Sequence, residues 1–65
     1  MNGIDAYATL QRAAGRIKES RDPAELERLL DDVEYLYEAM DPELQSVAEQ
    51  VMDRLRERIG QLRGS

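Results

Sequence analysis

The sequence DPAELERLLDDVEYLYEAMDP, residues 22–42, begins and ends with the same Asp-Pro pair. An aspartate at the N-cap accepts hydrogen bonds from the first backbone N–H groups of a helix, and proline fits the first helical position. Proline also disfavours the α conformation in the residue before it, so a preceding helix ends there. The two pairs therefore predict a helix over residues 23–40 and the start of another at residue 42. Glu25 also occupies the carboxylate position of a capping box.

Apolar residues recur at steps of three and four in three segments, and no segment alternates with the period of two typical of a half-buried strand. The middle segment has the widest apolar face, formed by Leu26, Leu29, Leu30, Val33, Leu36, Tyr37 and Met40. The first segment predicts a helix over about residues 4–20, through Ile4, Tyr7, Leu10, Ala14 and Ile17. The third predicts a helix over about residues 42–62, through Leu44, Val47, Ala48, Val51, Leu55, Ile59 and Leu62.

These three helices are joined by short connections, which place sequence neighbours antiparallel. We therefore expect an all-α protein, an up-down-up antiparallel three-helix bundle in which residues 1–65 form a single domain. A chain this short buries only about 60% of the surface that its unfolded form exposes. Its stability must come from good packing or from a partner.

The composition lacks the side chains that most catalytic and metal sites use. The chain has 65 residues and contains no Cys, His, Phe or Trp. It therefore has neither a nucleophilic thiol nor an imidazole base or ligand. The four glycines fit no phosphate-binding pattern, and Asp31 and Asp32 lie inside a predicted helix without the glycine of a calcium-binding loop. We expect no enzyme activity, no cofactor and no metal.

The negative charge is concentrated in the middle segment. Residues 1–21, 22–41 and 42–65 carry net charges of +2, −7 and 0, which give the total of −5. Within the middle segment, four acidic residues recur at steps of four, three and four, and we call them the acidic ribbon: Glu27, Asp31, Glu34 and Glu38. Like charges four residues apart destabilise a helix by about 0.2–0.5 kcal/mol per pair. The ribbon therefore requires a compensating interaction.

Two interpretations of the ribbon remain open. In the first, arginines of the neighbouring helices neutralise it across a helix–helix seam, either Arg12 and Arg16 or Arg56 and Arg63. In the second, the ribbon faces the basic surface of a partner. Tyr35 lies about 180° from Leu26 on a helical wheel, so it is expected to point outward. The candidate partner-binding residues are therefore Glu27, Asp31, Glu34, Tyr35 and Glu38.

Two residues of the third segment widen its apolar face beyond what two neighbouring helices require. Met52 and Ile59 either form the rim of the core or cover a self-association surface, as in a homodimer. Arg58 lies near the apolar face of the same segment. We expect its stem to lie along the bundle with the guanidinium in water.

These features favour a small non-enzymatic module that uses an acidic helical face to bind either a protein partner, for which a basic surface is one candidate, or itself. One alternative is an inert or self-associating scaffold, natural or designed. A further alternative is a nucleic-acid mimic, because eight acids along a helix of about 30 Å approach the charge spacing of one DNA strand.

The acidic composition argues against direct nucleic-acid binding. Residues 1–10 contain no basic cluster and no apolar segment, and no apolar run reaches the length of a membrane span. We expect a cytoplasmic protein without membrane contact. Its preference for Arg over Lys indicates a GC-rich bacterial genome, and its small, acidic, helical character is typical of a bacterial or phage protein.

Overall fold

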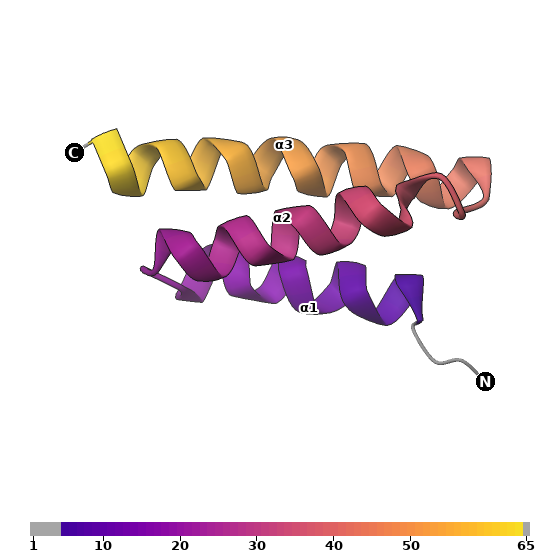
Figure 1. The fold of residues 1–65 in the computed structure, drawn as a ribbon, viewed down its shortest axis with the longest axis horizontal. Helices are drawn as coiled ribbons and strands as arrows, with labels where there is room; N and C mark the ends of the chain where they lie inside the picture. Colours follow the sequence, from indigo (N-terminus) through magenta and orange to yellow (C-terminus); the bar gives the residue numbers. More distant parts are fainter. Residues whose placement is uncertain (1–4, 65) are drawn as a thin grey trace.

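The computed structural model describes residues 5–64, which form three helices: α1 (Ala6–Glu19), α2 (Pro23–Tyr37) and α3 (Pro42–Gly64). No strand occurs within these residues. In Figure 1 the chain runs along α1, returns along α2 and runs along α3 in the direction of α1. The structure thus confirms the all-α three-helix prediction, and its course is consistent with the expected up-down-up order. The predicted first residue of α1, Ile4, lies outside the described residues.

Aspartate side chains cap the first two helices. Asp5 accepts a hydrogen bond from the backbone N–H of Tyr7 at 3.0 Å and starts α1. Asp22 accepts one from the backbone N–H of Ala24 at 3.0 Å, and Pro23 occupies the first turn of α2. Each cap satisfies a backbone donor that has no partner within its helix. The Asp22 cap agrees with the prediction, whereas the cap formed by Asp5 was not predicted from the sequence.

Helix α2 ends at Tyr37, three residues before the predicted end at residue 40. The backbone then forms hydrogen bonds between residues three apart instead of four. The N–H of Ala39 donates to the carbonyl of Leu36 at 3.0 Å, and the N–H of Met40 donates to the carbonyl of Tyr37 at 3.1 Å. Glu38 keeps α-helical dihedral angles, and Pro42, which starts α3, restricts the conformation of Asp41 directly before it. Met40 nevertheless stays in the core, at 7% exposure.

Gln45 joins the start of α3 to the end of α2. Its backbone N–H donates to the carbonyl of Asp41 at 2.8 Å, and its side-chain Nε2 donates to the carbonyl of Tyr37 at 3.0 Å. The second bond satisfies one of the last carbonyls of α2, which lack helical partners. Among residues 5–64 the carboxylate of Asp41 accepts no hydrogen bond, so the second Asp-Pro pair starts a helix without a side-chain cap.

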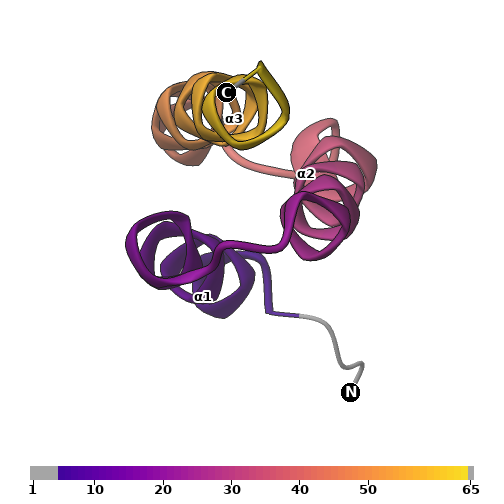
Figure 2. The ribbon, with the colours of Figure 1, turned by 90° about the vertical axis from the view of Figure 1, so that its left-hand side faces the viewer.

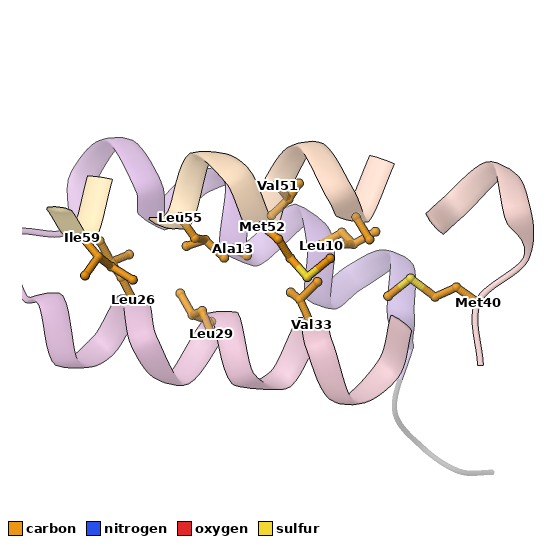
Figure 3. Packing of buried hydrophobic residues seen from close by; sticks show 11 residues of the cluster. Leu10, Ala13, Leu26, Leu29, Val33, Met40, Val51, Met52, Leu55 and Ile59 are labelled. Atoms are coloured by element: carbon orange, nitrogen blue, oxygen red, sulfur yellow. The ribbon is translucent and has the colours of Figure 1, made fainter. Parts of the chain in front are cut away.

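All three helices contribute to one core (Figure 3). Its buried apolar side chains are Leu10, Ala13, Leu26, Leu29, Val33, Met40, Ala48, Val51, Met52, Leu55 and Ile59. Met52 and Ile59 are 8% and 9% exposed, so they belong to the core and do not cover a separate surface. Val47, predicted to be in the core, is 46% exposed. It lies at the edge of the buried face of α3, on the side of α1.

The buried side of α1 agrees with the predicted one at Leu10 and Ile17 but differs from it at Tyr7 and Ala14. Tyr7 is 58% exposed and Ala14 is exposed, while Thr9 and Ala13 are 4% and 0% exposed. Both sets have helical spacing, so periodicity alone does not choose between them. The small side chain of Ala13 fits a close helix contact. The buried Thr9 hydroxyl has a hydrogen-bond partner, because it donates to the carbonyl of Asp5 at 3.1 Å. The prediction that Tyr7 and Ala14 face the core is therefore wrong.

Candidate protein interface

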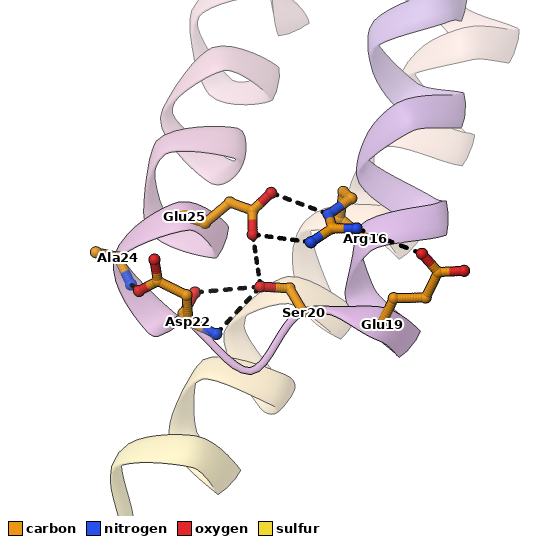
Figure 4. Close-up of polar contacts among 6 residues, drawn as sticks. All are labelled: Arg16, Glu19, Ser20, Asp22, Ala24 and Glu25. Atoms are coloured by element: carbon orange, nitrogen blue, oxygen red, sulfur yellow. Dashed lines mark hydrogen bonds and ion pairs between the residues drawn. The ribbon is translucent and has the colours of Figure 1, made fainter.

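A hydrogen-bond network fixes the start of α2 against the end of α1 (Figure 4). Arg16 donates to both carboxylate oxygens of Glu25, from Nε at 2.9 Å and from Nη2 at 3.2 Å. The buried Ser20 hydroxyl donates to Glu25 at 2.7 Å and accepts from the backbone N–H of Asp22 at 3.1 Å. Glu25 therefore does not close the expected capping box, because Ser20 takes the N–H that a capping box would use.

This network also sets the ionisation of its members. The hydrogen bond from Arg16, followed by that from Ser20, stabilises the carboxylate and lowers the pKa of Glu25. The same contact raises the pKa of Arg16. Two parallel N–H···O bonds give the pair a defined geometry as well as charge. The network holds α2 in one orientation, so the faces of α2 have fixed positions relative to α1.

Two arginines of α3 neutralise half of the acidic ribbon. Arg56 Nη2 lies 3.1 Å from Glu34 Oε2, and Arg63 Nη2 lies 2.8 Å from Glu27 Oε2. The internal interpretation is thus correct for these two carboxylates, with the arginines of α3 as partners. From α1, Arg16 reaches α2 at Glu25, which is outside the ribbon.

A tyrosine of α2 adds a third contact to the seam with α3. The Tyr37 hydroxyl donates a short hydrogen bond to the Glu49 carboxylate. This bond, together with desolvation by burial, raises the pKa of Tyr37. The seam therefore contains two ion pairs and one phenol–carboxylate contact, all on the side of α2 that faces α3.

The other half of the ribbon is open. Asp31 and Glu38 are exposed, and neither forms an ion pair within the part of the chain that the structure describes. The helical phase explains this division. At about 100° per residue, Glu27 and Glu34 lie nearer the α3 seam, whereas Asp31 and Glu38 lie about 40° further outward. The ribbon is thus one row in sequence but two surfaces in the structure.

Tyr35 lies at the centre of the open surface and is 81% exposed, as expected for an outward position. Asp32 also belongs here: it is exposed and three residues before Tyr35, and residues 5–64 offer it no ion pair. The sequence interpretation omitted Asp32 because it falls outside the ribbon's spacing. We define the Tyr35 face as Asp31, Asp32, Tyr35 and Glu38.

A depression of about 150 Å³ adjoins the Tyr35 face between α1 and α2. Tyr35 and Asp32 form one side of it, Arg12 and Thr9 the other, and Leu36 also lines it. Arg12 makes no ion pair with an acid of the described region, although it stands across from Asp32. The surface therefore combines an exposed aromatic ring, three open carboxylates and a hollow large enough for part of a partner side chain.

The described residues include no cluster of three or more side chains suited to bind a metal ion. None of the three helices, over the residues placed in the structure, has the length and hydropathy needed to cross a bilayer. Comparisons with protein-family models, with curated proteins and with solved structures find no match for this chain.

Proposed function

We propose that this chain is a non-enzymatic interaction module that binds a protein partner through the Tyr35 face, in the cytoplasm. The observation that carries the proposal is the environment of Tyr35, a ring 81% exposed among three carboxylates that no cation of residues 5–64 pairs with. Tyrosine is enriched among the residues that dominate binding energy at interfaces. A single exposed aromatic is ordinary, but its combination with open charges and a hollow favours recognition.

The charges indicate the chemistry of the partner. Asp31, Asp32 and Glu38 attract Lys and Arg side chains, and the Tyr35 ring offers a face on which a cation stacks. Complementary charges at the edge of an interface act mainly on the association rate and on specificity. The expected partner surface therefore has basic residues around an apolar position that receives the ring.

Glu27 and Glu34 should contribute less to partner binding than the open carboxylates, because both form ion pairs within the chain. Both carboxylates are already bound by arginines of the same chain, so a partner must compete for them. The same point weakens the nucleic-acid mimic, because its charge spacing counted every acid of residues 22–41, whereas Glu25, Glu27 and Glu34 are held in ion pairs. An inert scaffold stays the alternative, and it predicts no specific contact at Tyr35.

Site-specific photo-crosslinking in cells that produce the protein tests the proposal. A photoreactive phenylalanine analogue at position 35 should form a covalent adduct with a defined partner. The matched control places the analogue at Ser46, an exposed residue of α3 away from the Tyr35 face. The adduct at position 35 should diminish when Asp31→Asn and Glu38→Gln are added. Equal labelling from positions 35 and 46, or an adduct indifferent to both neutral substitutions, would contradict the proposal.

A further inference from the structure

We infer that the partner of the Tyr35 face is a second copy of this chain, which receives the Tyr35 ring in a groove between α1 and α3. This inference rests on the proposed function and gives its partner a chemical identity. The groove has a volume of about 190 Å³. Its apolar walls are Ala14 and Ile17 on α1 and Val47 and Val51 on α3. Val47, 46% exposed, is the large apolar side chain left open there.

The charge of the groove is opposite to that of the Tyr35 face. Lys18 and Arg54 line the groove together with its apolar walls. Neither of the two forms an ion pair with an acid anywhere in residues 5–64. The groove therefore presents two open cations, and the Tyr35 face presents three open carboxylates around its ring. Arg12 also borders the Tyr35 face, so the two surfaces are complementary in net charge, with three carboxylates and one cation on one side and two cations on the other.

The size of the groove suits the ring. A protein cavity of about 150 Å³ accommodates benzene, so a groove of about 190 Å³ has room for the Tyr35 side chain. The ring would cover Val47, while the hydroxyl stays at the polar margin that Gln50 and Arg54 form. Tyrosine suits such a position because one end of its side chain is apolar and the other forms hydrogen bonds.

The two surfaces lie on different sides of one molecule. The α2-facing edges of α1 and α3 carry Arg16 and Arg56, which bind α2, so the groove opens on their remaining sides. Figure 2 shows α1 and α3 together on one side of the bundle axis and α2 on the other. One copy therefore does not fill its own groove, and the contact between copies joins two unlike surfaces. The contact is head-to-tail and allows further copies to add.

The net charge of −5 repels two copies at long range. At physiological ionic strength, charges further apart than about 8 Å are largely screened, whereas opposite charges in contact are not. Local complementarity therefore decides whether the surfaces join.

Sedimentation equilibrium of the purified chain at micromolar to millimolar concentrations tests the inference. The wild-type chain should associate progressively. Tyr35→Ala removes the ring that enters the groove, and Val47→Asp places a charge in the groove. Each substitution should weaken association by about 30-fold or more. Tyr35→Ala keeps an intact groove and Val47→Asp keeps an intact Tyr35. A mixture of the two variants should therefore form a 1:1 dimer that does not elongate.

Matched variants separate specific effects from unfolding. Tyr35→Phe keeps the ring and should associate nearly as the wild type does. Ser46→Asp adds the same charge as Val47→Asp at the neighbouring exposed position and should leave association unchanged. Arg54→Glu provides a second groove variant at an exposed residue, in case Val47→Asp unfolds the chain, which thermal melting would reveal.

Each contrary outcome has a distinct meaning. A wild-type chain that stays monomeric at every concentration overturns the inference and leaves the proposed function with another partner. Association that is lost in Tyr35→Ala but kept in Val47→Asp and Arg54→Glu supports the Tyr35 face and overturns the groove. Association that survives Tyr35→Ala arises from a different surface and overturns the inference.

Discussion

Arg56 on α3 donates a hydrogen bond of 3.1 Å to Glu34 on α2, across 22 residues of sequence. Four residues after Glu34, Glu38 makes no such contact within the described residues. The two carboxylates belong to one row on the helical wheel, yet one contributes to the helix–helix seam and the other to the open surface. This division separates the structural acids of α2 from those available to a partner.

Substituting these two glutamates should affect stability differently. Glu34→Gln removes an exposed ion pair and should lower the free energy of unfolding by up to about 1 kcal/mol. Glu38→Gln removes only a like-charge neighbour and should leave it unchanged or raise it by about 0.2–0.5 kcal/mol. Urea unfolding followed by circular dichroism measures both. If Glu38→Gln were the more destabilising change, the assignment of the two carboxylates would be wrong.

Ser20→Ala should be among the most destabilising polar substitutions. Its hydroxyl is buried, at 2% exposure, and it connects the backbone N–H of Asp22 to the carboxylate of Glu25. Removing it leaves a part-buried donor without this acceptor, which typically costs about 1–3 kcal/mol. Ser46→Ala, on the exposed face of α3, should stay within about 0.5 kcal/mol of the wild type. Equal unfolding midpoints for the two variants would contradict a role for the network.

Stability should fall on the acid side partly through Glu25. The pKa of Glu25 is lowered in the folded chain, chiefly by Arg16. Its contribution is therefore present above the unfolded pKa of about 4.3 and is lost as the pH falls through the lower folded value. Glu25→Gln should flatten this part of the stability profile, measured by urea unfolding between pH 2 and pH 6. Glu57→Gln, the same change at an exposed residue of α3, should retain the wild-type slope.

On the alkaline side the sensitive group should be Tyr37. Its pKa is raised by the hydrogen bond to Glu49, so this contribution is complete below the unfolded pKa of about 10 and is lost as the pH rises through the folded value. Tyr37→Phe should remove this loss, and ultraviolet difference titration of the wild-type chain against Tyr37→Phe should show Tyr37 ionising above the ordinary tyrosine range. Were the wild-type chain and Tyr37→Phe to lose stability identically above pH 10, the contact would have no energetic role in solution.

Adjacent alanines test which side of α1 is buried. Ala13 is 0% exposed, so Ala13→Leu should overfill the core and lower the free energy of unfolding by about 1–3 kcal/mol. Ala14 is exposed, so Ala14→Leu should have an effect within about 0.5 kcal/mol. Thermal unfolding of the two variants gives the comparison. The reverse order would restore the face of α1 that Tyr7 and Ala14 define.

The sequence by itself determined the local features of this protein. The Asp-Pro pairs placed the starts of α2 and α3, because the Asp22 cap and the fixed φ of each proline act within a few residues. The apolar spacing of α2 also located its buried side and the outward position of Tyr35, since a broad stripe leaves little freedom of rotation.

Only the tertiary structure decided which side of α1 is buried and which acids of α2 stay open. Tyr7 with Ala14 and Thr9 with Ala13 both have helical spacing, so the choice depended on how closely α1 approaches its neighbours. The pairing of Arg56 with Glu34 and of Arg63 with Glu27 depended on distances across the seam between α2 and α3. Such distances follow from the packing of whole helices, which no local pattern encodes.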